Sequence, residues 1–166
     1  MLGGKGAKKQ AALVVMRRKE KEITQESDIE AIIHKALICR LGLSDGEQPY
    51  IVPMCFGYRK KTLYFHSALK GKKLDIIRKN QRVCFEFDVS TEIIPGEDAC
   101  KWGMTYQSII GFGRAVILEG FDEKLRAIEI IMSQYTDREF HFPDTALQNT
   151  AVIKVEIENM TGKQSI

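Results

Sequence analysis

The fold is decided by residues 37–67, LICRLGLSDGEQPYIVPMCFGYRKKTLYFHS, where apolar and polar side chains alternate along the chain. A period of two is typical of half-buried strands. Turn-forming residues at 44–46 and 59–61 divide the stretch into three strands, at 37–43, 50–58 and 62–67. The central strand contains Pro53, which cannot donate to a sheet ladder, so we expect an edge, a bulge or a local opening there.

The flanking segments add helices and further strands to this meander. Ser27 and Glu30 form a capping-box pattern, which predicts that a helix begins at Ser27. Asp122 is expected to cap another helix. The predicted helices are 27–36, 71–79 and 122–135, the further strands are 83–89, 106–119 and 153–158, and the intervening loops are 90–105 and 136–149.

These strands are joined mainly by turns rather than by regular helical crossovers. Such connections favour an antiparallel sheet over a doubly wound one. We therefore predict a mainly β protein, a six-stranded antiparallel β-barrel with helices packed outside it. The strand at 106–119 has Gly111, Gly113 and Ala115 on one face, which predicts close approach of another backbone or of a flat ligand.

The net charge of +3 is distributed unevenly. Residues 1–21 carry seven Lys or Arg and one Glu, whereas the rest of the chain has 18 basic and 21 acidic residues, a net charge of −3. We expect a flexible basic extension at 1–15 and a single domain at 16–166. The extension is either solvated or touches an anionic surface, but the acidic body argues against a nucleic-acid-binding domain.

The sequence contains no pattern typical of a metal site or of a membrane-spanning segment. The four Cys and three His are scattered, without Cys-x-x-Cys or His-Glu-x-x-His spacing, so we expect no metal site and small apolar roles for the cysteines. No apolar run reaches the roughly 18 residues of a membrane span. We expect a soluble cytoplasmic protein.

A binding site is indicated at residues 66–73, HSALKGKK, where a strand ends, the chain turns at Gly71 and a helix begins. A helix N-terminus binds phosphate through free N–H groups. Lys72 and Lys73 in the first turn oppose the helix dipole, which indicates a compensating anion; the alternative is a solvated lysine cluster. His66 would point out of the barrel, toward a ligand or a partner subunit, or it is an ordinary surface histidine.

Several separate blocks of the sequence resemble the Nim-type (5-nitroimidazole resistance) flavoproteins, a branch of the pyridoxamine 5'-phosphate oxidase-like FMN-binding split-barrel family. The resemblance spans about residues 16–165. The blocks are 17–24 (RRKEKEIT), 39–41 (CRL), 49–54 (PYIVPM), 57–58 (GY), 63–68 (LYFHSA), 71–73 (GKK), 80–85 (NQRVCF), 102–113 (WGMTYQSIIGFG) and 160–163 (MTGK).

The resemblance implies a split barrel that forms a homodimer with FMN at the subunit interface. It implies a phosphate clamp at Lys72 and Lys73, and a role for His66 near the substrate. Lys72 replaces an arginine of the oxidases, which loses bidentate geometry. The implied FMN contacts are Val52, Pro53, Met54, His66, Ser67, Lys72, Lys73, Trp102, Tyr106, Gln107 and Ser108.

Two functions remain open at this point. The resemblance implies an FMN-dependent oxidoreductase that acts on a small substrate such as a nitroaromatic compound, with His66 as catalytic residue. The alternative is a non-catalytic FMN or haem carrier on the same barrel. The C-terminal pyridoxal-phosphate-binding segment of the oxidases has no counterpart here, which speaks against vitamin B6 oxidation.

Overall fold

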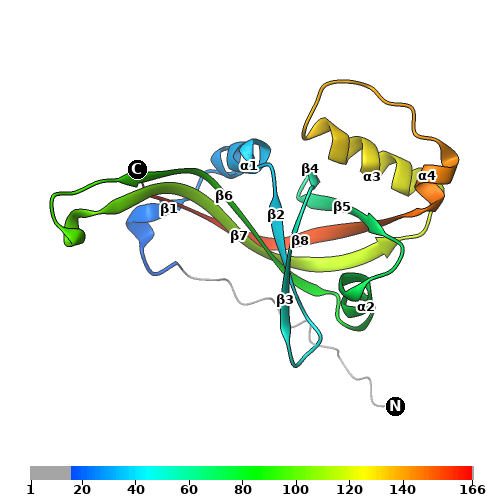
Figure 1. Ribbon diagram of the computed structural model, residues 1–166, viewed down its shortest axis with the longest axis horizontal. Helices are drawn as coiled ribbons and strands as arrows, with labels where there is room; N and C mark the ends of the chain where they lie inside the picture. Colours follow the sequence, from blue (N-terminus) through cyan, green and yellow to red (C-terminus); the bar gives the residue numbers. More distant parts are fainter. Residues whose placement is uncertain (1–15, 166) are drawn as a thin grey trace, which may run out of the picture.

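The computed structural model describes residues 16–165, so the predicted extension at 1–15 lies outside the described residues. Its strands form one antiparallel sheet in the order β3-β2-β6-β7-β8-β5-β4, with β1 paired to β8 (Figure 1). The strands are β1 (Glu22–Ile23), β2 (Cys39–Ser44), β3 (Pro49–Met54), β4 (Gly57–Arg59), β5 (Thr62–Ala68), β6 (Arg82–Ile94), β7 (Gly103–Leu118) and β8 (Thr150–Ser165).

This arrangement confirms the predicted class, a mainly antiparallel sheet with flanking helices of the split-barrel type. The described residues contain eight strands rather than six. The difference arises because the short β1 was not foreseen and because the predicted strand 50–58 is divided into β3 and β4 at Cys55 and Phe56. Pro53 lies in β3 at the end of the strand order, so the predicted edge position is confirmed.

Helices lie against the sheet and at its ends. They are α1 (Glu26–Lys35), α2 (Lys72–Lys79), α3 (Phe121–Ser133) and α4 (Asp144–Gln148), with 3₁₀ turns η1 (Lys19–Lys21) and η2 (Ala99–Lys101). Both predicted N-caps are wrong. Helix α1 begins before Ser27, with Gln25 as its N-cap, and α3 begins before Asp122, with Gly120 as its N-cap. Neither cap residue makes a side-chain hydrogen bond to its helix. The short α4 lies inside the predicted loop 136–149.

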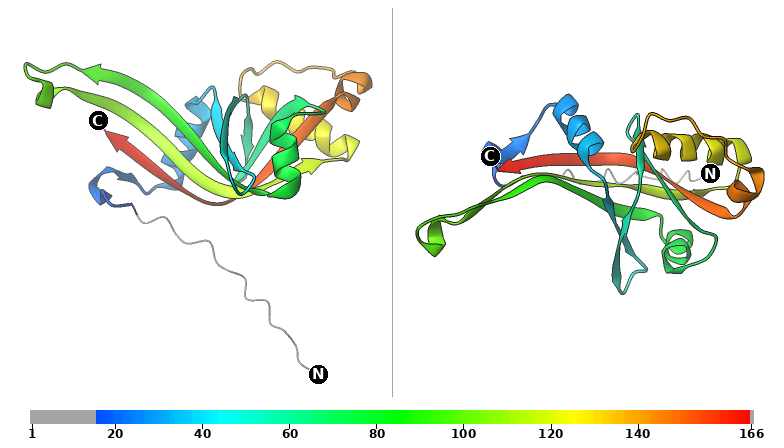
Figure 2. Two further views of the ribbon diagram at one scale, coloured as in Figure 1. Left: turned by 60° about the horizontal axis from the view of Figure 1, so that its bottom comes forward. Right: turned by 45° about the horizontal axis from the view of Figure 1, so that its top comes forward.

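The hairpin of β6 and β7 is much longer than the sequence pattern indicated. Residues 90–94 and 103–105 continue the two strands, with a change of register between Val89 and Glu92, so the predicted loop 90–105 is reduced to 95–102. The end of this hairpin, which we call the arm (residues 89–107), extends beyond α1 and away from α2 (Figures 1 and 2). Its exposed strands have no apolar alternation, which hid them from the sequence analysis.

Four phenylalanine rings occupy the centre of the barrel: Phe56, Phe65, Phe85 and Phe87 are fully buried. Gly111 lies directly opposite Phe85 on β7, and a Cβ at Gly111 would overlap the Phe85 ring. The small face of β7 therefore faces the core. Of the two predicted alternatives, close approach of another backbone is confirmed, because a Cβ on Gly113 would overlap the carbonyl oxygen of Glu156, and approach of a flat ligand is wrong. The other face of β7 points outward, with Ile110 47% exposed.

Helix α3 covers the outer face of the sheet at β4, β5 and β8 (Figure 1). It approaches β4 so closely that a Cβ on Gly57 would lie 2.6 Å from backbone atoms of Ile130. Lys124 on α3 donates a hydrogen bond of 2.9 Å to the carbonyl of Thr150 at the start of β8. This contact fixes the helix beside the strand that carries His66, because β8 pairs with β5.

Candidate functional site

The N-terminus of α2 presents donors that the protein leaves open. The amides of Leu74 and Asp75 donate to the carbonyl of Gly71, and no side chain caps the helix, so the preceding amides of Lys72 and Lys73 lie before the first helical hydrogen bond. Gly71 has φ +143°, a conformation that side-chain-bearing residues rarely adopt. Two open amides and two lysine residues thus lie in the first turn of one helix.

The position of α2 follows from an apolar face and a polar tie. Leu74, Ile76 and Ile77 are buried against the barrel. Asn80, which follows the helix, donates a hydrogen bond of 2.9 Å to the carbonyl of Ser44 at the end of β2. The helix is thereby tied to the β2–β3 hairpin.

Lys72 connects the helix N-terminus to the same hairpin from the other side. Its Nζ lies 4.9 Å from the centre of the Tyr50 ring in β3, a cation–π contact. The pKa of Asp45 is lowered mainly by hydrogen bonds from the amides of Gln48 and Glu47. The positive charge of Lys72 lowers this pKa further. The Lys72 end of the predicted clamp and the strand of Val52, Pro53 and Met54 are therefore neighbours.

The end of β5 supplies His66 and Ser67. Leu63 and Phe65 are buried, and His66 is exposed on the opposite face, as the strand period predicted. The Ser67 hydroxyl donates to the carbonyl of Ala68 at 3.1 Å, so it must turn to donate to a ligand. On β3, Pro53 is exposed, Val52 is half-buried and Met54 is buried.

The remaining predicted contacts lie on or beside the arm. Trp102 is 56% exposed beside η2. Tyr106 is half-buried with Lys163 Nζ 5.7 Å from its ring centre, and Gln107 Nε2 donates to Gln164 Oε1 at 3.4 Å. Ser108 pairs with Asp88 and with Lys163 in the sheet register.

Within one chain the predicted flavin contacts form two separate groups. Ser67 is opposite Ala151 on β8, whereas Gln107 is opposite Gln164 on the same strand. The thirteen residue steps from 151 to 164 correspond to roughly 40 Å along a strand. The structure thus brings together β3, the end of β5 and the start of α2. Trp102, Tyr106, Gln107 and Ser108 lie on or beside the arm, which extends away from α2 (Figure 1).

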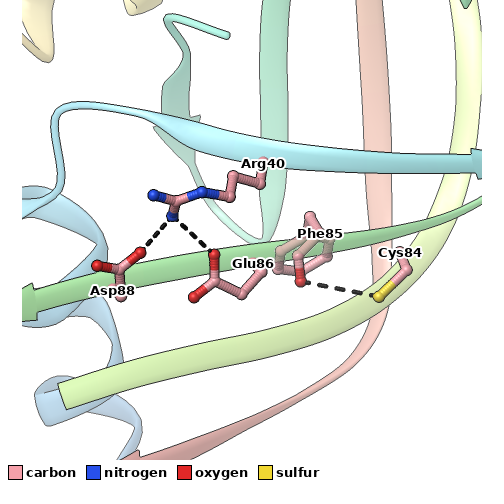
Figure 3. A network of polar contacts seen from close by, with 5 residues as sticks. All are labelled: Arg40, Cys84, Phe85, Glu86 and Asp88. Carbon is pink, nitrogen blue, oxygen red and sulfur yellow. Dashed lines mark hydrogen bonds and ion pairs between the residues drawn. The ribbon is translucent and has the colours of Figure 1, made fainter. Parts of the chain in front are cut away.

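An ionic network on the outer face of the sheet was not found by the sequence analysis. Arg40 of β2 donates to Glu86 at 3.0 Å and also to Asp88, both on β6 (Figure 3). These carboxylates raise the pKa of the Arg40 guanidinium, so its charge is fixed. The alternation showed Glu86 and Asp88 on a polar face, but only the β2–β6 pairing reveals their partner.

The cysteines are all unpaired thiols. Cys39 is buried, and burial raises its pKa, as expected for a small apolar residue; Cys84 is half-buried, whereas Cys55 and Cys100 are exposed. The part of the chain that the structure describes contains no cluster of three metal-binding side chains. No helix among residues 16–165 is long and apolar enough to cross a membrane.

The open antiparallel sheet, flanking helices and cationic α2 N-terminus define a split-barrel protein. Residues 25–164 match the family model described as pyridoxamine 5'-phosphate oxidase. The chain belongs to this family. Among curated proteins none matches this sequence significantly.

Solved structures agree with this assignment. A candidate 5-nitroimidazole antibiotic resistance protein from Bacteroides thetaiotaomicron is 37% identical, with 86% of each chain covered and a TM-score of 0.78. The flavocytochrome Anf3 from Azotobacter vinelandii is 16% identical (92% of this chain, 72% of that one, TM-score 0.79), and a FAD-binding protein from Mesorhizobium loti is 23% identical (86% and 96%, TM-score 0.63). The last two show likeness of fold.

Proposed function

We propose that this protein binds FMN and acts as an oxidoreductase on a small acceptor such as a nitroaromatic compound. The observation that carries the proposal is the α2 N-terminus, where Lys72 and Lys73 occupy the first turn and their two amides make no helical hydrogen bond. Membership of the family and the 37% identical resistance-type relative support the choice of cofactor and substrate.

The donor set at α2 fits the phosphate of FMN. A phosphate dianion accepts hydrogen bonds from a helix N-terminus and is stabilised by ammonium groups. Lys72 and Lys73 supply the charges, and the Ser67 hydroxyl supplies a further donor once it turns from Ala68. The contact of Lys72 with Tyr50 supports an anion site beside β3, and we propose that the edge backbone of β3 lies along the flavin ring.

We also propose a homodimer in which each flavin is held by both chains. One chain cannot bring Gln107 and Ser108 to its own Lys72, given their separation along β8. We propose that a second copy, related by a two-fold axis, supplies its arm to the first chain's α2. Ile93, Trp102 and Met104 expose between 47% and 63% of their area on or beside the arm, which fits a surface that a partner covers.

When bound, FMN supplies the electron transfer between a reduced donor and the acceptor. The protein's own contribution is binding, orientation and proton supply. His66 is exposed at the end of β5, directly before Ser67, and we propose that its imidazole supplies a proton to the acceptor. The four free thiols fit a reducing compartment, and we place the protein in the cytoplasm.

The second candidate is a non-catalytic flavin or haem carrier. It is favoured by the likeness of fold to the flavocytochrome Anf3 and to a FAD and haem binding protein from Mycobacterium smegmatis. Steady consumption of NADH or NADPH with a nitroaromatic acceptor distinguishes the enzyme from the carrier.

The first experiment is an absorption spectrum of the purified protein, with mass spectrometry of any released compound. We expect a flavin spectrum and the mass of FMN. A colourless protein that takes up no added FMN would contradict the proposal, and a Soret band would move it to haem.

The shared site is tested by mixing two inactive variants. A chain with Lys72→Gln and Lys73→Gln and a chain with Gln107→Ala and Ser108→Ala each carry one defective half. We expect mixed dimers to recover one intact site and bind FMN at half the wild-type stoichiometry. Binding that stays absent in the mixture excludes a site divided between chains.

A further inference from the structure

A cavity lies on the outer face of the sheet, away from the predicted flavin contacts. It encloses about 260 Å³ between α3 and strands β4, β5 and β8, and we call it the α3 groove. Arg59, Arg126 and Ile130 line it, and the same three residues line an adjoining cavity of about 500 Å³. None of the residues proposed to bind FMN lines either cavity.

Two arginine side chains at the α3 groove are without protein partners. Among residues 16–165, neither Arg59 nor Arg126 makes a side-chain hydrogen bond or an ion pair. Within the same residues, Arg18, Arg40, Arg78 and Arg114 each have a protein acceptor, whereas Arg82 and Arg138 have none. Arg59 and Arg126 are therefore distinguished by lining the same cavity. Two like charges that line one cavity repel each other, and an anion between them removes this repulsion.

The other charged residues at the α3 groove leave this excess in place. Lys154 donates a hydrogen bond of 2.7 Å to Glu156, which offsets its charge. Glu123 is the acidic residue that lines the cavity of about 260 Å³, and it makes no ion pair in the described part of the chain. Glu129 lines the adjoining cavity of about 500 Å³, so the positive excess is confined to the cavity of about 260 Å³, where two arginines face one carboxylate.

The floor of the α3 groove is apolar. Leu118 and Ala127 are only 9% and 1% exposed, and they belong to a small buried cluster on the outer face of the sheet. Tyr64 packs on this cluster and is half-buried, with part of its ring available to the cavity. An occupant therefore meets cations at the rim and carbon atoms beneath.

We propose that the α3 groove binds a small organic acid, a carboxylate on a compact apolar or aromatic body. The carboxylate lies between Arg59 and Arg126, whose guanidinium groups match its geometry. The apolar body lies over Tyr64 and the Leu118–Ala127 floor. A volume of about 260 Å³ suits a ligand of benzoate size and lies below that of sites for drug-sized molecules. The proposal does not depend on flavin binding.

Benzoate is the probe, added to the purified full-length protein, with backbone amide shifts followed by NMR. We expect saturable shifts at Arg59, Tyr64 and Arg126 and an unchanged visible spectrum of any bound cofactor. Benzyl alcohol, which keeps the ring, and inorganic phosphate, which keeps a negative charge, should bind at least tenfold more weakly. Equal binding of either compound overturns the assignment to an organic acid.

Substitutions at exposed positions test the two arginines. Arg59→Gln and Arg126→Gln should each weaken benzoate about tenfold, as expected for a lost charge-assisted hydrogen bond. Arg138→Gln, which removes a charge at a different cavity, should leave binding unchanged. Glu123→Gln should tighten benzoate two- to threefold. The proposal is overturned if the Arg59→Gln/Arg126→Gln double variant binds benzoate with wild-type affinity. It is also overturned if benzoate shifts only the amide signals of the predicted flavin contacts.

Discussion

The hydroxyl oxygen of Tyr135 accepts a hydrogen bond of 2.8 Å from the amide of Phe56. The same hydroxyl donates to the carbonyl of Leu37 at 3.0 Å. Tyr135, two residues after the end of α3, thereby joins the β3–β4 junction to the segment after α1. The neighbouring Gln134 donates to the carbonyls of Ile33, His34 and Ala36, which reinforces this connection.

Replacing Tyr135 with Phe should lower the free energy of unfolding by about 1–3 kcal/mol, because the Phe56 amide loses its acceptor beside the core. Urea denaturation measures the change. Tyr50→Phe is the control, since the Tyr50 hydroxyl makes no hydrogen bond within residues 16–165. An equal effect of both substitutions would show that the Tyr135 hydroxyl has no special role.

The contact between Gly111 and Phe85 gives a second prediction. Gly111→Ala places a methyl group on the Phe85 ring and should destabilise the fold by about 1–3 kcal/mol. Phe85→Leu opens space across the strand pair, so Gly111→Ala should cost less in that background. Thermal unfolding of the two single variants and the double variant gives the coupling. Strict additivity would mean that the two residues do not clash.

The raised pKa of Tyr58 predicts that the protein loses stability at high pH. It is buried and donates to Glu30 at 2.9 Å; burial, with the Glu30 hydrogen bond, raises the pKa of Tyr58 to about 12. In the unfolded chain a tyrosine titrates near 10. Stability from Tyr58 is therefore complete below about pH 10 and is lost as the pH rises toward 12.

Tyr58→Phe should give a shallower decline of the unfolding free energy between pH 9 and 11.5 than the wild type. The decline does not vanish, because burial also raises the pKa of Tyr135 to about 12. Urea titrations at each pH measure both curves. Parallel curves would exclude a contribution from Tyr58.

The proposed phosphate clamp gives a prediction on affinity. Lys72→Gln and Lys73→Gln should each weaken FMN by about tenfold or more, because each removes a charge-assisted contact to the phosphate. Lys79→Gln is a matched control at the other end of α2. Fluorescence quenching of added FMN measures the dissociation constants. Equal losses at Lys79 would indicate a general charge effect.

His66→Ala should leave FMN bound and lower turnover with a nitroaromatic acceptor at least tenfold, since proton transfer by a side chain contributes about 10²–10⁴. Its side chain is exposed, so the fold should tolerate the change. Rapid-mixing kinetics of flavin reoxidation separate this step from cofactor binding. Unchanged turnover removes His66 from the mechanism.

Local periodicity in the sequence predicted the elements that have one buried face. Cys39, Leu41, Leu63 and Phe65 are all buried, as the alternation indicated, because each strand is apolar toward the core and polar on its other side. The helix at α2 was found for the same reason. The strand residues at 90–94 and 103–105 and the end of β8 were missed, because these residues, apart from the buried Gly162, are exposed or half-buried and give no apolar alternation.

The sequence by itself determined the mainly antiparallel fold and the cationic turn at Gly71, since both depend on neighbours within a few residues. Only the tertiary structure decided that Gly111 faces Phe85 rather than a ligand, that Arg40 meets Glu86, and that Ser67 and Gln107 lie far apart along β8. These relationships join residues that are distant in the chain. They are set by strand register and side-chain packing, which no short window of sequence contains.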